Sequence, residues 1–377
     1  MNDAQEKSTT FKGLVQRIPV VRGLLTGRSL CVLHCDKEPQ KGSPIFVAVH
    51  GTFWVSRAGW TQHNSKLLLA ISKKWPDAGI YRFEWSGVNG ASHRLDAADV
   101  LAERLADLAS HYDTSSIVTI AHSHGGNVVA WAATQLKRPL DAAIYLNTPF
   151  IQVLRDSKAS SNWLRVALGV FALYSVIGVP MVLLGVKGRQ NSIAIMITLI
   201  LVMILLEVAV APRIEAIRER LVCVSNGARR VAKELVVFVV GDEASAGLGA
   251  VYFAHWLVRR WGLWLTVIMF CVSTLFIVFA SYFPRGDQIG AWIYRGWVAI
   301  LYLFFAVAVG GYGMAHGLVA LDSAVTVTPA PTGEMDFATV GWTDKDQLRH
   351  SLIYESTEAI ATMITWLERC TQSEPIE

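Results

Sequence analysis

The second half of the chain carries four long runs of apolar residues, and this feature limits the possible folds more than any other. The runs cover residues 166–186, 190–211, 261–284 and 296–321. An α-helix that crosses a lipid bilayer needs about 20 mostly apolar residues, and each run is near or above that length. We therefore expect four transmembrane helices. The alternative is that the four runs form buried core helices of one large soluble domain.

Composition favours a chain that is part membrane-embedded and part soluble. Hydrophobic residues make up 53% of the sequence and charged residues only 17%, whereas soluble domains usually carry about a quarter charged residues. The 34 basic and 30 acidic residues still need an aqueous environment, so the chain is not made of membrane helices alone. The net charge is only +4, and the sequence has no clustered basic stripe of the kind that binds nucleic acid. We expect membrane lipids as partners and no nucleic acid.

The apolar runs come in two pairs, and a short polar gap joins the members of each pair. Each pair is therefore predicted to form a helical hairpin, at residues 164–211 and 261–321. If so, everything outside the hairpins lies on one side of the membrane, and the basic residues near the helix ends concentrate on that side. The positive-inside rule assigns that side to the cytoplasm. We predict a multi-pass integral membrane protein with a cytoplasmic soluble domain.

The remaining sequence has the pattern of an α/β domain. Short runs rich in apolar and β-branched residues predict strands at 44–50, 79–85, 116–121, 142–146, 235–240 and 324–328. Apolar residues at helical spacing predict helices at 95–111 and 352–369. Continuous apolar strands that alternate with helices indicate a mostly parallel, doubly wound sheet covered on both faces.

A serine lies in the turn between the third of these strands and the helix after it. Ser123 belongs to the segment Ala121-His122-Ser123-His124-Gly125-Gly126. A sharp strand-to-helix turn lifts a serine hydroxyl above the sheet and tolerates only small residues around it, which is the nucleophile-elbow arrangement. Ala121 takes the place of the usual first glycine and adds only a methyl group. Ser123 is therefore the candidate nucleophile, and an ordinary glycine-rich turn is the alternative.

An earlier strand end carries the candidate oxyanion hole. The segment His50-Gly51-Thr52-Phe53 follows strand 44–50. With a nucleophile elbow, the loop after such a strand donates one backbone N–H to the oxyanion, and the residue after the nucleophile donates the other. We assign the first donor to Thr52 or Phe53 and the second to His124.

A serine nucleophile needs a base, and the base needs a group that orients it. With an elbow of this kind, the acid and then the histidine follow the serine in the chain. Asp242 comes just after strand 235–240, and its neighbour Glu243 is the alternative acid. The histidines after Asp242 are His255, His316 and His350. The first two lie in or beside apolar runs, so His350 is the candidate base.

Together these motifs resemble the α/β-hydrolase fold family, and more narrowly its lipase-like members. The segments that carry the resemblance are HGTF at 50–53, WSG at 85–87, AHSHGG at 121–126, GDEAS at 241–245 and HSLIY at 350–354. The resemblance implies hydrolysis of an ester or thioester acyl bond through an acyl-enzyme, with no metal and no organic cofactor. The chain departs from the family in its two hairpins, which follow strand 142–146 and the acid.

These expectations combine into a membrane-anchored serine hydrolase that acts on a lipid or an acylated small molecule. Two alternatives stay open: a non-catalytic hydrolase-like domain used for binding, and an acyltransferase with the same three residues. The predicted parts of the chain are an N-terminal segment (1–27), three pieces of hydrolase core (28–160, 212–260 and 322–377) and the two hairpins (164–211 and 261–321).

Overall fold

The structure of the protein is a computed structural model. The described residues are 31–52, 59–155, 212, 215–240, 242, 323–328, 333–341, 350 and 352–372. The chain divides into two compact units. The first comprises Met1–Gln152, Cys223–Leu248 and Thr326–Glu377, and the second comprises Val153–Val222 and Gly249–Val325. The predicted boundaries between hydrolase core and hairpins stay a prediction.

The first unit is built on a seven-stranded sheet. Its strands, in spatial order, are β1 (Val32–Lys37), β3 (Gly79–Glu84), β2 (Ile45–Val49), β4 (Ile117–His122), β5 (Ala142–Leu146), β7 (Glu234–Val239) and β9 (Asp336–Val340). β1 pairs antiparallel with β3, and every other pair is parallel. The mostly parallel α/β sheet predicted from the sequence is confirmed.

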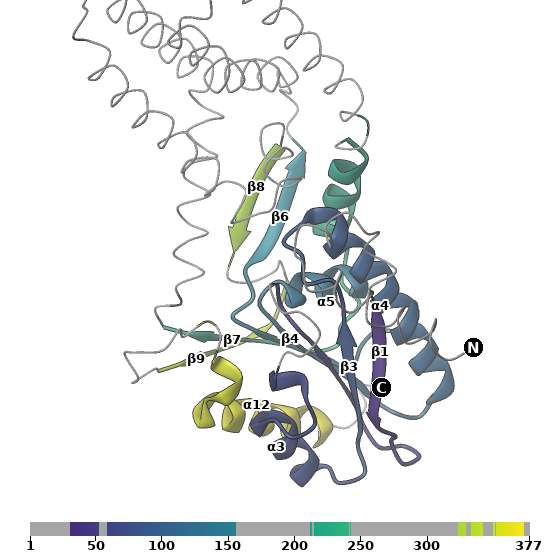
Figure 1. Cartoon of the computed structure of the whole chain (residues 1–377), viewed down its shortest axis with the longest axis vertical. Coiled ribbons are helices and arrows are strands. Elements are labelled where there is room, and N and C mark those ends of the chain that lie inside the picture. The colour runs from purple at the N-terminus through teal and green to yellow at the C-terminus, as the bar shows by residue number, and fades with distance from the viewer. Residues whose placement is uncertain are drawn as a thin grey trace, which may run out of the picture. The chain divides into compact units, whose positions relative to one another are not determined.

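Helices cover both faces of this sheet. On one face, α3 (Lys66–Lys74) and α12 (Thr357–Gln372) share an apolar core with the strands; Leu68 of α3 and Trp366 of α12 are buried there with Phe46 of β2. On the other side, α5 (Gly125–Ala133) packs on α4 (Ala91–His111) and on β2, β4 and β5. Figure 1 shows the sheet between these two helix pairs. Because both faces are covered, β2, β4 and β5 are buried along their whole length.

The order of the strands fixes where a ligand can bind. From β2 the chain moves to one side to form β3, and it then crosses back to form β4 on the other side of β2. Such a reversal leaves a crevice at the carboxyl ends of the two strands beside it, where open α/β sheets bind their ligands. Thr52 follows β2 and Ser123 follows β4, so both predicted motifs lie at this switch point.

The predicted strand at 324–328 does not belong to the main sheet. It is β8 (Ser323–Thr328), which pairs with β6 (Phe150–Arg155) in a separate two-stranded sheet. The last place in the main sheet goes to β9, which the sequence analysis did not predict. β9 is an edge strand whose Phe337 is 55% exposed, so it lacks the continuous apolar run of a central strand. Apolar patterning identifies a strand but not its partner.

The predicted transmembrane hairpins, 164–211 and 261–321, lie outside the described residues. Within the described part of the chain, no helix combines the length and the apolar character that crossing a bilayer requires. The four membrane helices therefore stay a prediction from the sequence.

Candidate active site

Ser123 forms a strained turn between β4 and α5. Its φ is 54°, a left-handed conformation that residues other than glycine rarely adopt. The turn is held by two backbone hydrogen bonds: the Ser123 N–H donates to the carbonyl of Leu146, and the Gly126 N–H donates to the carbonyl of Ser123, each at 2.9 Å. Surrounding structure must maintain such a conformation, and strain of this kind is typical of functional sites.

Three glycines leave the space that this turn needs. A Cβ on Gly125 would lie 2.4 Å from the carbonyl oxygen of His50, and one on Gly126 would lie 2.1 Å from Oγ1 of Thr148. A Cβ on Gly51 would lie 2.8 Å from the Cβ of Ser123. The helix after the serine therefore packs directly against the loop after β2, and the glycines at 51, 125 and 126 permit that close approach.

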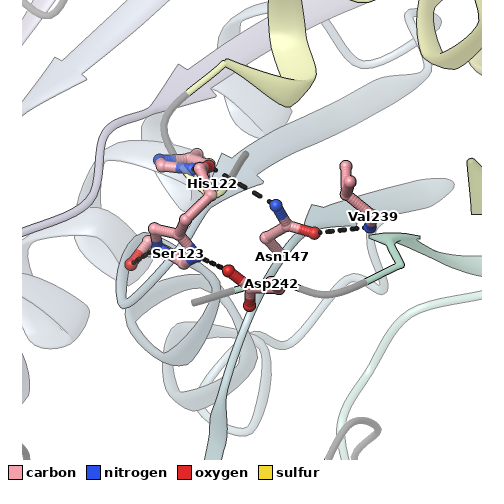
Figure 2. A network of polar contacts seen from close by, with 6 residues as sticks. His122, Ser123, Asn147, Val239 and Asp242 are labelled. Atoms are coloured by element: carbon pink, nitrogen blue, oxygen red, sulfur yellow. Dashed lines mark hydrogen bonds and ion pairs between the residues drawn. The ribbon is translucent and has the colours of Figure 1, made fainter. Parts of the chain in front are cut away.

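The imidazole of His350 lies within hydrogen-bond distance of both other predicted catalytic side chains, Ser123 and Asp242. His350 Nε2 is 2.9 Å from Ser123 Oγ, and His350 Nδ1 is 2.8 Å from Asp242 Oδ1. Figure 2 shows Ser123 and Asp242 among the residues of this polar network. A carboxylate at Nδ1 favours the tautomer with its proton there, which leaves Nε2 to accept the proton of Ser123. The imidazole therefore has the orientation that a general base for this serine requires.

The three residues reach this place from distant parts of the sequence. Ser123 follows β4 and Asp242 follows β7, and both strands run parallel within the sheet, so their carboxyl ends meet at one edge. His350 comes after β9 and just before the short 3₁₀ helix η5 (Ile353–Glu355). The alternative acid, Glu243, lies outside the described residues.

The loop after β2 holds the first predicted oxyanion donor in a fixed direction. The N–H of Trp85 donates to His50 Nε2 at 3.1 Å, so the His50 proton is on Nδ1, which lies 2.7 Å from the carbonyl of Gly51. Because a trans peptide is planar, fixing this carbonyl also fixes the direction of the Thr52 N–H. Thr52 is buried. Phe53, the other candidate donor in this loop, lies outside the described residues.

The second predicted donor, His124, is the residue between the serine and α5. It is 5% exposed, and its Nδ1 lies 3.3 Å from Asn127 Nδ2. Asn127 also donates to the carbonyl of Pro149 at 2.8 Å and accepts from the N–H of Ile151 at 2.9 Å. The backbone after Ser123 is therefore tied to the start of β6.

Two further residues contact His350 that the sequence analysis did not place in the site. His122 Nε2 lies 2.7 Å from the main-chain carbonyl oxygen of His350, and Asn147 Nδ2 lies 3.4 Å from the same oxygen. Asn147 also accepts a hydrogen bond from the N–H of Val239 at 2.9 Å, and Figure 2 shows its side chain between His122 and Val239. Asn147 has a φ of 44°, and an asparagine just after a strand was the only sequence signal for it.

His122 is enclosed and electrically neutral. Burial, and to a lesser extent the nearby His350, lowers its pKa from 6.5 to about 3. Its ring lies edge-on to Tyr354 with centroids 5.3 Å apart, and Tyr354 stacks on Trp60 at 5.4 Å. A neutral ring beside His350 avoids repulsion when His350 takes up a proton.

Among the residues that the structure describes, no group of three or more His, Cys, Asp or Glu side chains is arranged to hold a metal ion.

Comparisons with known proteins find distant structural likenesses only. No family model matches the chain, and no curated protein matches it. Among solved structures, a carboxylesterase structure from the archaeon Nitrososphaera gargenis is 10% identical to this chain, and the match covers 92% of this chain and 98% of the other, with a TM-score of 0.35. MenH from S. aureus is 12% identical, with coverages of 91% and 100% and a TM-score of 0.35.

The enol-lactonase from Burkholderia xenovorans LB400 is 11% identical, with coverages of 91% and 99% and a TM-score of 0.34. Likenesses at these values assign neither a reaction nor a substrate to this chain, so the chemistry follows from the geometry of its own residues.

Proposed function

We propose that this protein is a serine hydrolase that cleaves an ester or thioester acyl bond through an acyl-enzyme. One observation carries the proposal: the imidazole of His350 lies between Ser123 Oγ and Asp242 Oδ1, at 2.9 Å and 2.8 Å. Nucleophile, base and orienting acid within hydrogen-bond reach are the signature of covalent acyl transfer. The strained backbone of Ser123 and its place at the switch point of the sheet support the same function.

In the first half-reaction, Ser123 Oγ attacks the acyl carbonyl while His350 Nε2 takes the serine proton. Asp242 keeps the imidazole in the required tautomer and stabilises its charged form. The carbonyl oxygen becomes an oxyanion, which backbone N–H groups at Thr52 or Phe53 and at His124 are proposed to bind. Each such donor is worth about 3–4 kcal/mol in the transition state.

The tetrahedral intermediate collapses when His350 returns the proton to the leaving oxygen or sulfur, which releases an alcohol or a thiol. Water then enters, and His350 removes one of its protons while the water oxygen attacks the acyl-enzyme. The second tetrahedral intermediate releases the carboxylic acid and restores the Ser123 hydroxyl. This sequence needs no metal and no organic cofactor.

We further propose that the enzyme is a multi-pass membrane protein whose catalytic part is cytoplasmic and whose substrate is a lipid or another acylated molecule. The predicted hairpins are joined to the chain after β6 and after Asp242. Further back in the chain, the first hairpin follows β5 and the second follows β7, and the carboxyl ends of these two strands lie at the catalytic edge of the sheet. Insertions connected there favour a substrate that comes from the membrane. Extraction of the expressed protein by detergent, but not by alkaline carbonate, tests the membrane part of the proposal.

A fluorophosphonate probe tests the chemistry, because it reacts with an activated serine and needs no knowledge of the substrate. The wild type is expected to be labelled and the Ser123→Ala variant is not. An unlabelled wild type that is folded, by circular dichroism and thermal melting, would instead support a non-catalytic binding domain. Lipid profiling of cells that express wild type or Ser123→Ala identifies the substrate, and added alcohol acceptors reveal acyl transfer in place of hydrolysis.

A further inference from the structure

The main chain of His350 is held as closely as its ring. His122 Nε2 lies 2.7 Å from the carbonyl oxygen of His350, and Asn147 Nδ2 approaches the same oxygen at 3.4 Å. The ring is held separately, at Nδ1, by Asp242. His350 is thus fixed at two points, one on each side of its rotatable side-chain bonds.

We propose that His122 is a positioning residue that fixes the backbone of His350, so that the imidazole lies between Ser123 and Asp242, and that Asn147 connects the same carbonyl to β7. This inference rests on the proposed hydrolase function and adds to it how the base is placed. His122 contacts neither a substrate nor a reacting atom and acts only through His350.

The chemistry of the contact identifies His122 as the donor. A carbonyl oxygen can only accept, so the proton of the neutral His122 ring is on Nε2. Burial keeps the ring neutral, with a pKa of about 3. The two imidazole centroids are 5.0 Å apart. A lysine or arginine donor at this place would put a positive charge beside the imidazolium that forms on His350, whereas a neutral histidine does not.

The surroundings of His122 keep its ring from rotating away. Its main chain belongs to the last residue of β4, directly before Ser123, and pairs with Leu146 of β5. Tyr354 and Trp60 lie edge-on to the ring, at centroid distances of 5.3 Å and 6.3 Å. The backbone of His350 is therefore held by a residue of β4, the same strand that leads to Ser123.

Asn147 adds a connection to the acid. Its N–H donates to the carbonyl of Val237, and its Oδ1 accepts from the N–H of Val239, both at 2.9 Å. Val239 is the last residue of β7, three residues before Asp242. One side chain thus joins the end of the strand that leads to the acid with the carbonyl of the base.

The test compares two amides of different length at position 122 in the full-length, detergent-purified protein. In His122→Gln the amide nitrogen reaches about as far as Nε2, and in His122→Asn it reaches only about as far as Nδ1. Hydrolysis of a short soluble nitrophenyl ester is measured per active site, with active sites counted by fluorophosphonate titration. This count corrects for any unfolded fraction.

We expect His122→Asn to lower kcat about 10- to 100-fold with KM changed less than about threefold, since small misplacement of a catalytic group is expensive in rate. His122→Gln is expected to stay within about fivefold of the wild type, because its donor still reaches the carbonyl. Equal activity in the Asn and Gln variants, or a loss that appears in KM alone, overturns the proposal.

A second variant keeps the test decisive if both substitutions at 122 unfold the protein. Asn147→Asp keeps the acceptor for the Val239 N–H and removes the donor to His350. We expect a smaller loss of kcat, about threefold to tenfold, because 3.4 Å is the longer of the two contacts. Unchanged kcat in Asn147→Asp, when the variants at position 122 do not fold, overturns the proposal.

The wild type separates the two proposals. A wild type that neither reacts with the probe nor hydrolyses esters contradicts the hydrolase function itself, whereas an active wild type with unaffected variants contradicts only the positioning role.

Discussion

Ser123 and Asn147 follow two neighbouring parallel strands, β4 and β5, and both adopt left-handed backbone conformations, with φ of 54° and 44°. Their side chains make different contacts. The hydroxyl of Ser123 is directed to His350, whereas the amide of Asn147 contacts the backbone of Val239 and of His350. The same sharp turn thus presents a reactive group at one strand end and ties segments together at the next. Asparagine adopts this conformation readily and serine does not.

The largest expected effect is a difference in kcat between variants at the two left-handed turns, Ser123 and Asn147. Ser123→Ala should reduce kcat by at least about 10⁴-fold, since removal of a triad nucleophile leaves only binding and oxyanion stabilisation. Asn147→Ala should retain far more activity, because the nucleophile, base and acid all remain. Ester hydrolysis by the purified variants measures both. Comparable losses in the two would mean that Asn147 belongs to the reacting groups.

The identity of the acid gives the next largest effect. Asp242→Asn should lower kcat by about 10⁴-fold, because an amide stabilises the wrong tautomer of the base. Glu243→Gln should stay within about twofold of the wild type, since the structure places Asp242 at the imidazole. Measuring kcat for both variants identifies the acid. A large loss in Glu243→Gln with little loss in Asp242→Asn would assign the acid to Glu243.

A methyl group added at either glycine of the serine turn should destabilise the fold, and the atom that this methyl meets decides whether a second substitution can relieve the strain. Gly125→Ala and Gly126→Ala should each destabilise the fold by about 1–3 kcal/mol, as overpacking does. Thr148→Ala removes the two atoms nearest to a Cβ at 126 and should recover part of the loss in Gly126→Ala. It should not help Gly125→Ala, where the blocking atom is the backbone carbonyl of His50. Urea denaturation of the single and double variants gives these differences.

His122 and Asn147 share the carbonyl of His350, but only His122 titrates. Its pKa in the folded state is about 3, below its usual 6.5. Between these values the unfolded chain binds a proton that the folded chain does not, so stability falls as the pH falls through this window. From pH 7 to pH 5 this contributes about 2 kcal/mol of lost stability.

Denaturation of wild type and His122→Gln at both pH values measures this contribution. The variant should lose about 2 kcal/mol less than the wild type on acidification. Asn147→Asp is no substitute for this comparison, because it adds a titrating group. Identical pH dependence in wild type and His122→Gln would show that folding does not lower the pKa of His122.

The smallest effect tests whether the two left-handed turns differ in strain. Ser123→Gly should raise the free energy of unfolding by about 1 kcal/mol, because glycine adopts a positive φ without steric conflict. Asn147→Gly removes the same conflict but also the acceptor for the buried Val239 N–H, so it should lower stability by about 1 kcal/mol. Thermal melts of both variants give the signs. A gain in both would mean that the side chain of Asn147 contributes nothing to the fold.

Most strands of the core could be predicted from the sequence, because buried parallel strands are short runs of apolar residues. The predicted runs at 44–50, 79–85, 116–121, 142–146 and 235–240 correspond to β2, β3, β4, β5 and β7. β1, at an edge and mostly exposed, and β9, at the other edge, were missed. An edge strand has water on one side, so its residues do not show the pattern on which the prediction rests.

Ser123 and the elements on both sides of it were predictable from a short stretch of sequence, because a nucleophile elbow needs small residues at adjacent positions in the chain. Asp242 and His350 were also predicted, from their order and from the ends of predicted elements. The folded structure was needed to show that His350 contacts both Ser123 and Asp242, that β8 pairs with β6 outside the main sheet, and that His122 and Asn147 contact the carbonyl of His350. Hydrophobic periodicity indicates which residues are buried, whereas strand partners and contacts between residues more than 200 positions apart depend on how the whole chain packs.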